Sequence, residues 1–291
     1  MKHQGNGNFP KAIKSFIGYL EGTGKSEHTI KNYRLDLLAF QNFLNEEKQP
    51  PRLESLTHSH LEEFHKQLKG AGLKTNTRRR KLLTVQKFLR FLIQRKKLAI
   101  ELSRKLPTPH KMERIPATFP SGEILERVRK LPAVTEIETR NRVFLWTLAE
   151  TGCLVSEVKR IRFDELETKG TRPKLFISGK NSRTLLVSME LYQAVQVLKT
   201  KGTSPWLFLG FNKFGPMGLP MTSRGAEMLV RSYAAKLGFP ALTPRAFRHS
   251  AAAAWLKEGI SPGEVQARLG LKTDYAFRSY QQLLSRAAEM T

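Results

Sequence analysis

Apolar residues recur at helical spacing through the first third of the chain. Between residues 29 and 44, the positions Ile30, Tyr33, Leu37, Phe40 and Leu44 fall on one face of a helix. The same periodicity predicts four helices, over residues Lys11–Leu20, Thr29–Leu44, Thr57–Leu68 and Thr77–Leu98. Because no alternating strand pattern interrupts these segments, we expect a compact helical domain over residues 1–106.

The rest of the chain has a mixed pattern. Residues 107–120 are rich in proline and lack apolar periodicity, which is typical of a linker. Residues 121–291 predict a second domain with helices at Ser121–Leu131, Thr139–Thr151, Leu191–Leu198 and Met221–Leu237, and a glycine- and aromatic-rich loop at Trp206–Pro220. Two β-prone runs, Lys174–Ile177 and Thr184–Val187, flank a turn and predict a hairpin. The predicted fold is mostly α with a small β-hairpin or sheet (α+β), in two domains.

The C-terminal helices carry clear start and stop signals. Thr243 supplies a capping hydroxyl, and Pro244 occupies the first helical position. Arg248 therefore falls in the first turns of a helix, where the macrodipole favours an anion. Gly259 and Gly270 end this helix and the next one, and a third short helix is expected around Tyr280.

Positive charge is the main feature of the composition. The chain has 50 Lys and Arg against 25 Asp and Glu, a formal net charge of +25. This excess is spread through both halves of the chain, so it indicates a polyanionic partner bound by both domains. Arg78, Arg79, Arg80 and Lys81 lie at an expected helix start, where the dipole disfavours cations. We expect DNA phosphates to offset this cost; a solvated cationic helix face is the alternative.

Other features narrow the class of protein. The single Cys153 excludes an internal disulfide and suits a reducing compartment. No apolar run approaches the ~20 residues of a membrane span, and the N-terminus lacks a signal-peptide pattern. We therefore expect a cytoplasmic, nucleoid-associated protein without a membrane partner. The spacing of His58, His60 and His65 fits no zinc-ligand pattern, so we expect neither a metal nor another cofactor.

Arg245-x-x-Arg248-His249, Leu269-Gly270-Leu271 and Tyr280 follow one another at a distinctive spacing. They resemble the signatures His-x-x-Arg-His, Leu-Gly-His and a nucleophilic tyrosine of the tyrosine recombinase (phage integrase) family, in particular of its Xer-like members. Residues 151–157, Thr-Gly-Cys-Leu-Val-Ser-Glu, resemble the box Thr-Gly-x-Arg-x-Ser-Glu. Lys180 resembles the family's catalytic lysine in a Gly-Lys turn; because the turn is about two residues shorter than usual, Arg183 is the alternative.

The resemblance implies a definite chemistry and architecture. Tyr280 would attack a phosphodiester of double-stranded DNA to form a 3′-phosphotyrosine, Arg248 would bind the phosphate, and Lys180 would act as the acid. Arg183 and His249 are expected to contact DNA as well. A helical core-binding (SAM-like) domain and a catalytic domain would close around the duplex, in a homo- or hetero-oligomer that is a tetramer in the family.

Three family positions hold other residues. Leu154 replaces an arginine, Arg245 a histidine, and Leu271 a histidine or tryptophan. Losing one such cation in phosphoryl transfer costs on the order of 10³–10⁵ in rate. Arg245 lies one helical turn from Arg248 and is a candidate replacement for the missing arginine.

Two interpretations therefore remain open. One is a site-specific recombinase or integrase acting on a mobile element or chromosome, and the other is a non-catalytic DNA-binding accessory protein. RNA binding explains the charge but not the motif spacing.

Overall fold

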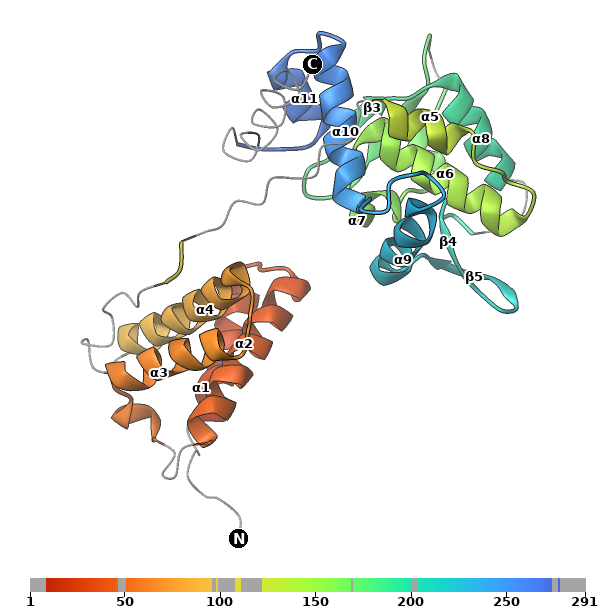
Figure 1. The fold of residues 1–291 in the computed structure, drawn as a ribbon. Helices are drawn as coiled ribbons and strands as arrows, with labels where there is room; N and C mark the ends of the chain where they lie inside the picture. Colours follow the sequence, from red (N-terminus) through yellow and green to blue (C-terminus); the bar gives the residue numbers. More distant parts are fainter. Residues whose placement is uncertain are drawn as a thin grey trace. The chain divides into compact units, whose positions relative to one another are not determined.

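The computed structural model describes residues 9–46, 51–95, 98, 108–110, 122–168, 170–199, 204–273 and 277. The chain divides into two compact units, unit 1 (residues 1–114) and unit 2 (residues 115–291). Figure 1 shows that helices dominate both units. The predicted mostly helical class with a small β component is confirmed. Of the predicted linker, residues 107–120, the structure describes only 108–110.

Unit 1 contains the four helices that the apolar periodicity predicted. They are α1 (Phe9–Gly22), α2 (Glu27–Asn45), α3 (His58–Gly70) and α4 (Thr75–Gln94), with a 3₁₀ turn at Leu53–Ser55. Ser26 caps α2 by accepting a hydrogen bond from the Thr29 N–H. The end of α4 differs from the prediction, because the described helix stops at Gln94 and not at Leu98.

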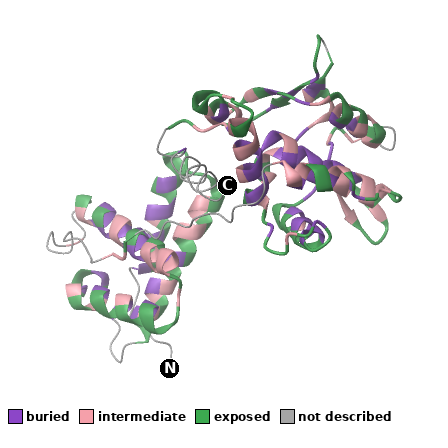
Figure 2. Cartoon of the chain, turned by 45° about the horizontal axis from the view of Figure 1, so that its top comes forward, coloured by how far each residue is buried: buried purple, intermediate pink, exposed green. Residues whose placement is uncertain are grey.

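Aromatic rings fill the core of unit 1. The ring centroid of Phe16 on α1 lies 5.5 Å from that of Phe88 and 5.2 Å from that of Phe91, both on α4. Phe40 of α2 meets Phe64 of α3 at 5.0 Å in an edge-to-face arrangement. Figure 2 shows the buried residues on the helix faces that point to the interior of each unit.

Unit 2 is built around helix α6 (Glu136–Thr151). This helix contacts α5 (Glu123–Arg129), α8 (Met189–Lys199) and α10 (Pro244–Lys257). Thr135 and Glu138 form a capping box at its start, and Gly152 ends it with a φ of 59°. The remaining helices of the described part are α7 (Val155–Val158), α9 (Ser223–Ala234) and α11 (Pro262–Arg268), with a 3₁₀ turn at Phe163–Glu165.

The predicted hairpin is confirmed and belongs to a three-stranded antiparallel sheet. Its strands are β1 (Leu166–Glu167), β2 (Lys174–Ile177) and β3 (Arg183–Leu186), in that order. Leu175 pairs with Leu185, and both side chains are buried in the core of unit 2.

The prediction of a loop at Trp206–Pro220 is wrong. This segment contains a second antiparallel pair, β4 (Leu209–Asn212) and β5 (Gly215–Pro220). Its glycines and prolines concealed the strand signal. A tertiary contact supports the pair: the Arg140 guanidinium on α6 donates to the Leu209 carbonyl oxygen and lies 4.6 Å from the ring centroid of Phe211.

Helices α10 and α11 enclose a separate small core. It consists of Ala252, Val265, Leu269 and Phe277, with Leu271 packed against it. Within the described residues, no helix has the length and apolar character needed to cross a membrane.

Candidate active site and DNA-facing surface

Arg248 lies at the centre of the candidate site in unit 2. Its side chain projects from α10 into the interior and is only 5% exposed. One guanidinium nitrogen donates to the Gly152 carbonyl oxygen at 2.8 Å, and the other donates to the Leu269 carbonyl oxygen. Gly152, at a φ of 59°, lets the end of α6 pack closely against its neighbours, since a Cβ there would lie 3.2 Å from side-chain atoms of both Ala251 and Leu269. Backbone carbonyls at two helix ends therefore hold the guanidinium in place.

Arg183 forms a second internal junction beside Arg248. Its guanidinium makes a two-bonded ion pair with Glu157, with nitrogen–oxygen distances of 2.7 and 3.1 Å. It also donates to the carbonyl oxygens of Arg268 and Asn181, at 2.6 and 3.1 Å, and to the Cys153 sulfur at 3.3 Å. These contacts give Arg183 an internal role, because every guanidinium N–H has an acceptor within the protein.

These contacts change the titration of their partners. Burial would raise the pKa of Glu157, but hydrogen bonds from Arg183 and from the Leu154 N–H hold it below the ordinary value. Burial raises the pKa of the Cys153 thiol to about 11, and Arg183 opposes this shift only in part. Glu157 is therefore ionised and Cys153 is a neutral thiol at neutral pH. The ionised carboxylate of Glu157 is the ion-pair partner of Arg183.

The turn that carries Lys180 lies next to the Leu269-Gly270 turn. Lys180 is exposed between β2 and β3. A Cβ built on Gly270 would lie 3.3 Å from the Asn181 Cβ and 2.8 Å from an Arg183 nitrogen. The hairpin turn and the carbonyl that accepts from Arg248 are thus close neighbours, although Lys180 and Leu269 are far apart in the sequence.

His249 and Arg245 lie on the same helix as Arg248. His249 is half-buried, whereas Arg245 is exposed at the start of α10. Burial, assisted by the charges of Arg245 and Arg248, lowers the pKa of His249 to about 4. The imidazole is therefore neutral at physiological pH. Because Arg245 is exposed and Arg248 is buried, the two guanidinium groups have different surroundings.

Leu154 and Leu271 are the other two positions that differ from the family pattern; the first is exposed and the second packs among apolar side chains. Leu154 is 43% exposed at the start of α7, where its backbone N–H donates to Glu157 at 2.7 Å. Leu271 packs against the small core of α10 and α11. Neither side chain can donate a hydrogen bond. Tyr280 lies outside the described residues.

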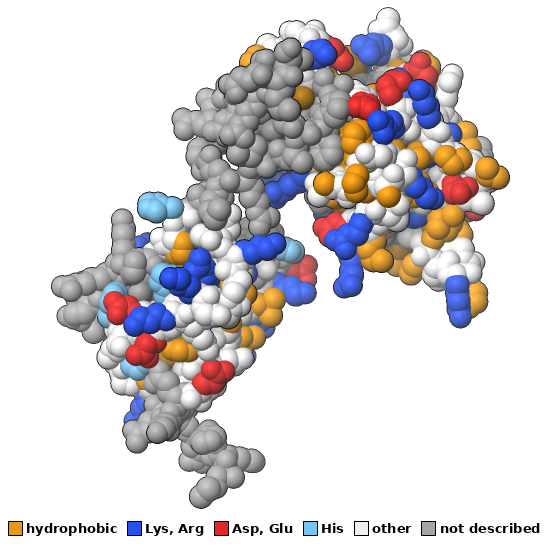
Figure 3. All heavy atoms as spheres, viewed as in Figure 1, with side chains coloured by type: hydrophobic (Ala, Val, Ile, Leu, Met, Phe, Trp, Pro, Cys, Tyr) orange, Lys and Arg blue, Asp and Glu red, His pale blue; other side chains and the backbone are white. Residues whose placement is uncertain are grey.

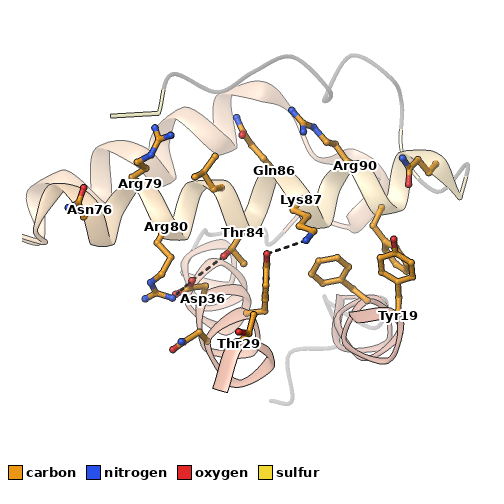
Figure 4. A pocket seen from close by; sticks show the side chains of 16 residues that line it. Tyr19, Thr29, Asp36, Asn76, Arg79, Arg80, Thr84, Gln86, Lys87 and Arg90 are labelled. Atoms are coloured by element: carbon orange, nitrogen blue, oxygen red, sulfur yellow. Dashed lines mark hydrogen bonds and ion pairs between the residues drawn. The ribbon is translucent and has the colours of Figure 1, made fainter. Parts of the chain in front are cut away.

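In unit 1, the cationic run at the start of α4 has an internal anion. Asp36 of α2 is 1% exposed and pairs with Arg80 and, at 3.3 Å, with Lys81. It also accepts from the Thr84 hydroxyl at 3.2 Å. Figure 4 shows Arg80 and Thr84 directed toward Asp36. Arg80 and Lys81 therefore have an internal anion at the start of α4, and a contact of these two residues with DNA stays a prediction. Arg78 donates to the Thr75 hydroxyl.

A different face of α4 presents cations away from Asp36. Arg79, Gln86 and Arg90 follow helical spacing, and Figure 4 shows their side chains pointing away from Asp36, at the α4 edge of the groove described below. We call these three residues the α4 ridge. Arg79 donates to the Pro109 carbonyl oxygen at 2.7 Å, so residues 108–110 lie against this end of the ridge. A groove of about 950 Å³ lies between α4 and the two helices α1 and α2.

Asp36 was not among the functional residues that the sequence predicted. Asp36 could have been found, since a carboxylate beside Tyr33, Leu37 and Phe40 on an apolar helix face indicates a buried partner. The residues described contain no group of three or more His, Cys, Asp or Glu arranged to hold a metal ion. Figure 3 shows Lys and Arg side chains on the visible surfaces of both units.

Two family models account for most of the chain. The model described as "Phage integrase family" matches residues 123–286, and that described as "Phage integrase, N-terminal SAM-like domain" matches residues 13–96. The chain belongs to the phage integrase family. Similar proteins of this family include the tyrosine recombinase XerC of Staphylococcus carnosus, 27% identical over 256 residues that cover 84% of this chain and 83% of the relative. The tyrosine recombinase XerD of Oceanobacillus iheyensis is 23% identical over 270 residues, 89% of each chain.

Solved structures of recombinases share the fold of this phage integrase family member. The XerH recombinase in a pre-cleavage complex with its difH substrate has a TM-score of 0.72 at 17% identity, covering 96% of this chain and 83% of that one. A lambda integrase dimer bound to a COC′ core site has a TM-score of 0.67 at 14% identity, covering 93% and 76%. At such identities the likeness establishes the architecture, and the predicted family resemblance is confirmed by the family models.

Proposed function

We propose that this phage integrase family member is a site-specific DNA recombinase that acts through a 3′-phosphotyrosine. The observation that carries the proposal is the meeting of Arg248 and the Lys180 turn at Leu269-Gly270. Phosphoryl transfer is accelerated by a cation that stabilises charge on the phosphate oxygens and by an acid that protonates the leaving oxygen, and we assign these roles to Arg248 and Lys180. The relatives named tyrosine recombinases and the XerH structure solved with its DNA substrate support the same reaction.

The reaction assigns one task to each residue. The Tyr280 oxygen attacks phosphorus and forms the phosphotyrosine bond, while the bond from phosphorus to the 5′ oxygen breaks. The ammonium of Lys180 gives a proton to that leaving oxygen, and Arg248 stabilises the charge on the nonbridging oxygens. The neutral His249 beside Arg248 is suited to assist proton movement. The bond energy is kept, so a second DNA strand can reverse the attack.

A non-catalytic DNA-binding accessory protein is the second candidate. The observation that favours it is the pair Leu154 and Leu271, since two apolar side chains stand where the family has charge-stabilising groups. Arg245 could replace one of these groups only if its exposed guanidinium reaches the phosphate bound at Arg248.

The partner and the assembly follow from the same proposal. We infer that residues 1–106 and 121–291 bind opposite sides of double-stranded DNA and that residues 107–120 connect them. The α4 ridge is the face of unit 1 that we assign to DNA, with Arg79 and Arg90 on phosphates. A homo- or hetero-oligomer on DNA and a cytoplasmic, nucleoid-associated location belong to this proposal.

A suicide DNA substrate, whose cleaved end cannot be rejoined, tests the proposal. We expect a covalent protein–DNA adduct that disappears in Tyr280→Phe and persists in Tyr192→Phe, which changes a tyrosine of α8. Specific footprinting without an adduct would reject strand cleavage and support the accessory role. Failure to protect any DNA site, at protein concentrations that bind DNA nonspecifically, would reject both candidates.

A further inference from the structure

Arg183 and Arg248 join the same two stretches of the chain. Arg248 donates to the carbonyl oxygens of Gly152 and Leu269. Arg183 donates to the sulfur of Cys153, which follows Gly152 in the chain. It also donates to the carbonyl oxygen of Arg268, which precedes Leu269. The end of α6 is therefore connected to the end of α11 by two guanidinium groups side by side.

Arg183 differs from Arg248 because it also holds the hairpin. It begins β3 and donates to the Asn181 carbonyl oxygen, one residue beyond Lys180. Its two-bonded ion pair with Glu157 fixes the plane of the guanidinium, and its side chain is 9% exposed. Gly270, at a φ of 64°, leaves the space in which the guanidinium lies, because a Cβ there would come within 2.8 Å of it.

We propose that Arg183 is a positioning residue that holds the Lys180 turn against the Leu269-Gly270 turn. This inference rests on the proposed function of Lys180 as the acid. Lysine is a flexible side chain with a compact charge, so the backbone that carries it must be placed accurately. The Arg183 contacts supply that placement on the side of the turn that faces Leu269 and Gly270. Arg183 itself does not touch the DNA.

The expected consequence is a loss of cleavage without a loss of binding. A misplacement of about 1 Å in a reacting group lowers the rate by about 100-fold. We expect Arg183→Met to lower single-turnover cleavage of the suicide substrate by about 10- to 100-fold while DNA affinity stays within about threefold. Arg183→Lys keeps a positive charge for Glu157 but loses the planar guanidinium that makes two parallel hydrogen bonds. Its cleavage rate should therefore lie between those of Arg183→Met and the unchanged protein. Arg172→Met, which changes an exposed arginine before β2, is the matched control and should cleave as the unchanged protein does.

A substrate with sulfur in place of the bridging 5′ oxygen separates positioning of Lys180 from other effects. A thiolate leaves without prior protonation, so the general acid is not needed. If Arg183 acts through Lys180, Arg183→Met and the unchanged protein should cleave this substrate at similar rates. A defect of the same size on the sulfur substrate, or an equal loss of DNA affinity, would overturn the inference.

Two measurements that need no DNA cleavage test this inference separately from the proposed function. Cys153 is the only cysteine of the chain and accepts from Arg183, so its labelling by a thiol reagent reports opening of this junction. We expect Arg183→Met, Arg183→Lys and Glu157→Gln each to increase Cys153 labelling and amide exchange in residues 178–182 and 268–271 together. Exchange in α8 should stay unchanged, which identifies variants that remain folded.

The combinations of outcomes are decisive. If the unchanged protein forms no covalent adduct with the suicide substrate, strand cleavage is rejected. Coupled opening of the Lys180 turn and the Leu269-Gly270 turn in the variants would still support the positioning role of Arg183. Exchange that stays unchanged at both turns in all three variants would reject the positioning role, whether or not the protein cleaves DNA.

Discussion

The Arg248 guanidinium donates a hydrogen bond to the carbonyl oxygen of Gly152 at 2.8 Å and so connects α10 to the end of α6. A second hydrogen bond runs to the carbonyl oxygen of Leu269, so both of these acceptors are backbone atoms. Neither Leu154 nor Leu271 supplies one of these two acceptors. The phosphate-binding group of the proposed reaction can remain preorganised in a chain that lacks the second family arginine.

This arrangement predicts a gain of activity from Leu154→Arg. The side chain of Leu154 is exposed, so an arginine can be accommodated there without creating a buried charge. We expect suicide-substrate cleavage to increase by at least about 10-fold, a part of the 10³–10⁵ that one such cation contributes. Val134→Arg adds the same charge at a site that is 89% exposed in the segment before α6, and it should not increase cleavage. Equal cleavage by both variants would argue against our alignment of residues 151–157.

Replacing Asp36 should destabilise unit 1. Asp36→Asn removes the anion that pairs with Arg80 and Lys81 and leaves Lys81 poorly compensated. We expect the free energy of unfolding to fall by about 2–4 kcal/mol, as when one partner of a buried ion pair is lost. Denaturant unfolding measures this change. Glu62→Gln, at an exposed carboxylate of α3, should change stability by less than about 0.5 kcal/mol. Similar effects for both variants would show that burial of Asp36 has no energetic importance.

His249 should make stability depend on pH in a mildly acidic range. Its folded-state pKa of about 4 lies below the ordinary 6.5, so between these values the unfolded chain binds a proton that the folded chain does not. Acidification through this range therefore favours unfolding, and the effect levels off below about pH 4. Urea unfolding at several pH values should give a shallower dependence for His249→Gln. The exposed His28→Gln serves as the control, and an unchanged slope in His249→Gln would contradict the prediction.

The α4 ridge should contribute to DNA affinity without regard to sequence. Arg79→Ala and Arg90→Ala each remove a cation that we place on a phosphate. We expect weaker binding to all duplexes and a reduction of about 1 in the slope of log affinity against log salt. Arg34→Ala removes an exposed cation of α2 outside the ridge and is the control. If Arg34→Ala lowered DNA affinity and its salt dependence as much as the ridge variants, the α4 ridge would have no special role. DNA affinity would then depend on the total charge of unit 1.

The local sequence contained most of the helical architecture. Apolar spacing located the helices of unit 1, because burial of one face imposes a period of 3.6 residues. Thr243 and Pro244 marked a helix start, because they satisfy or avoid unpaired backbone N–H groups without help from distant residues. The spacing of the motifs around Arg248 indicated the family before any contact was known.

The partners of the charged groups were decided only in three dimensions. Arg80 meets Asp36 from 44 positions away, and Arg183 meets Glu157 from 26 positions away. The periodicity of the sequence does not show which carboxylate will pair with a given arginine. From the local sequence, we therefore expected these arginines to contact DNA. The β4–β5 pair was hidden for a related reason, since its support includes Arg140 of α6, which is distant in sequence. Helix positions follow from the order of neighbouring residues, whereas the choice between an internal ion pair and a nucleic-acid contact follows from which side chains the fold brings within hydrogen-bonding distance.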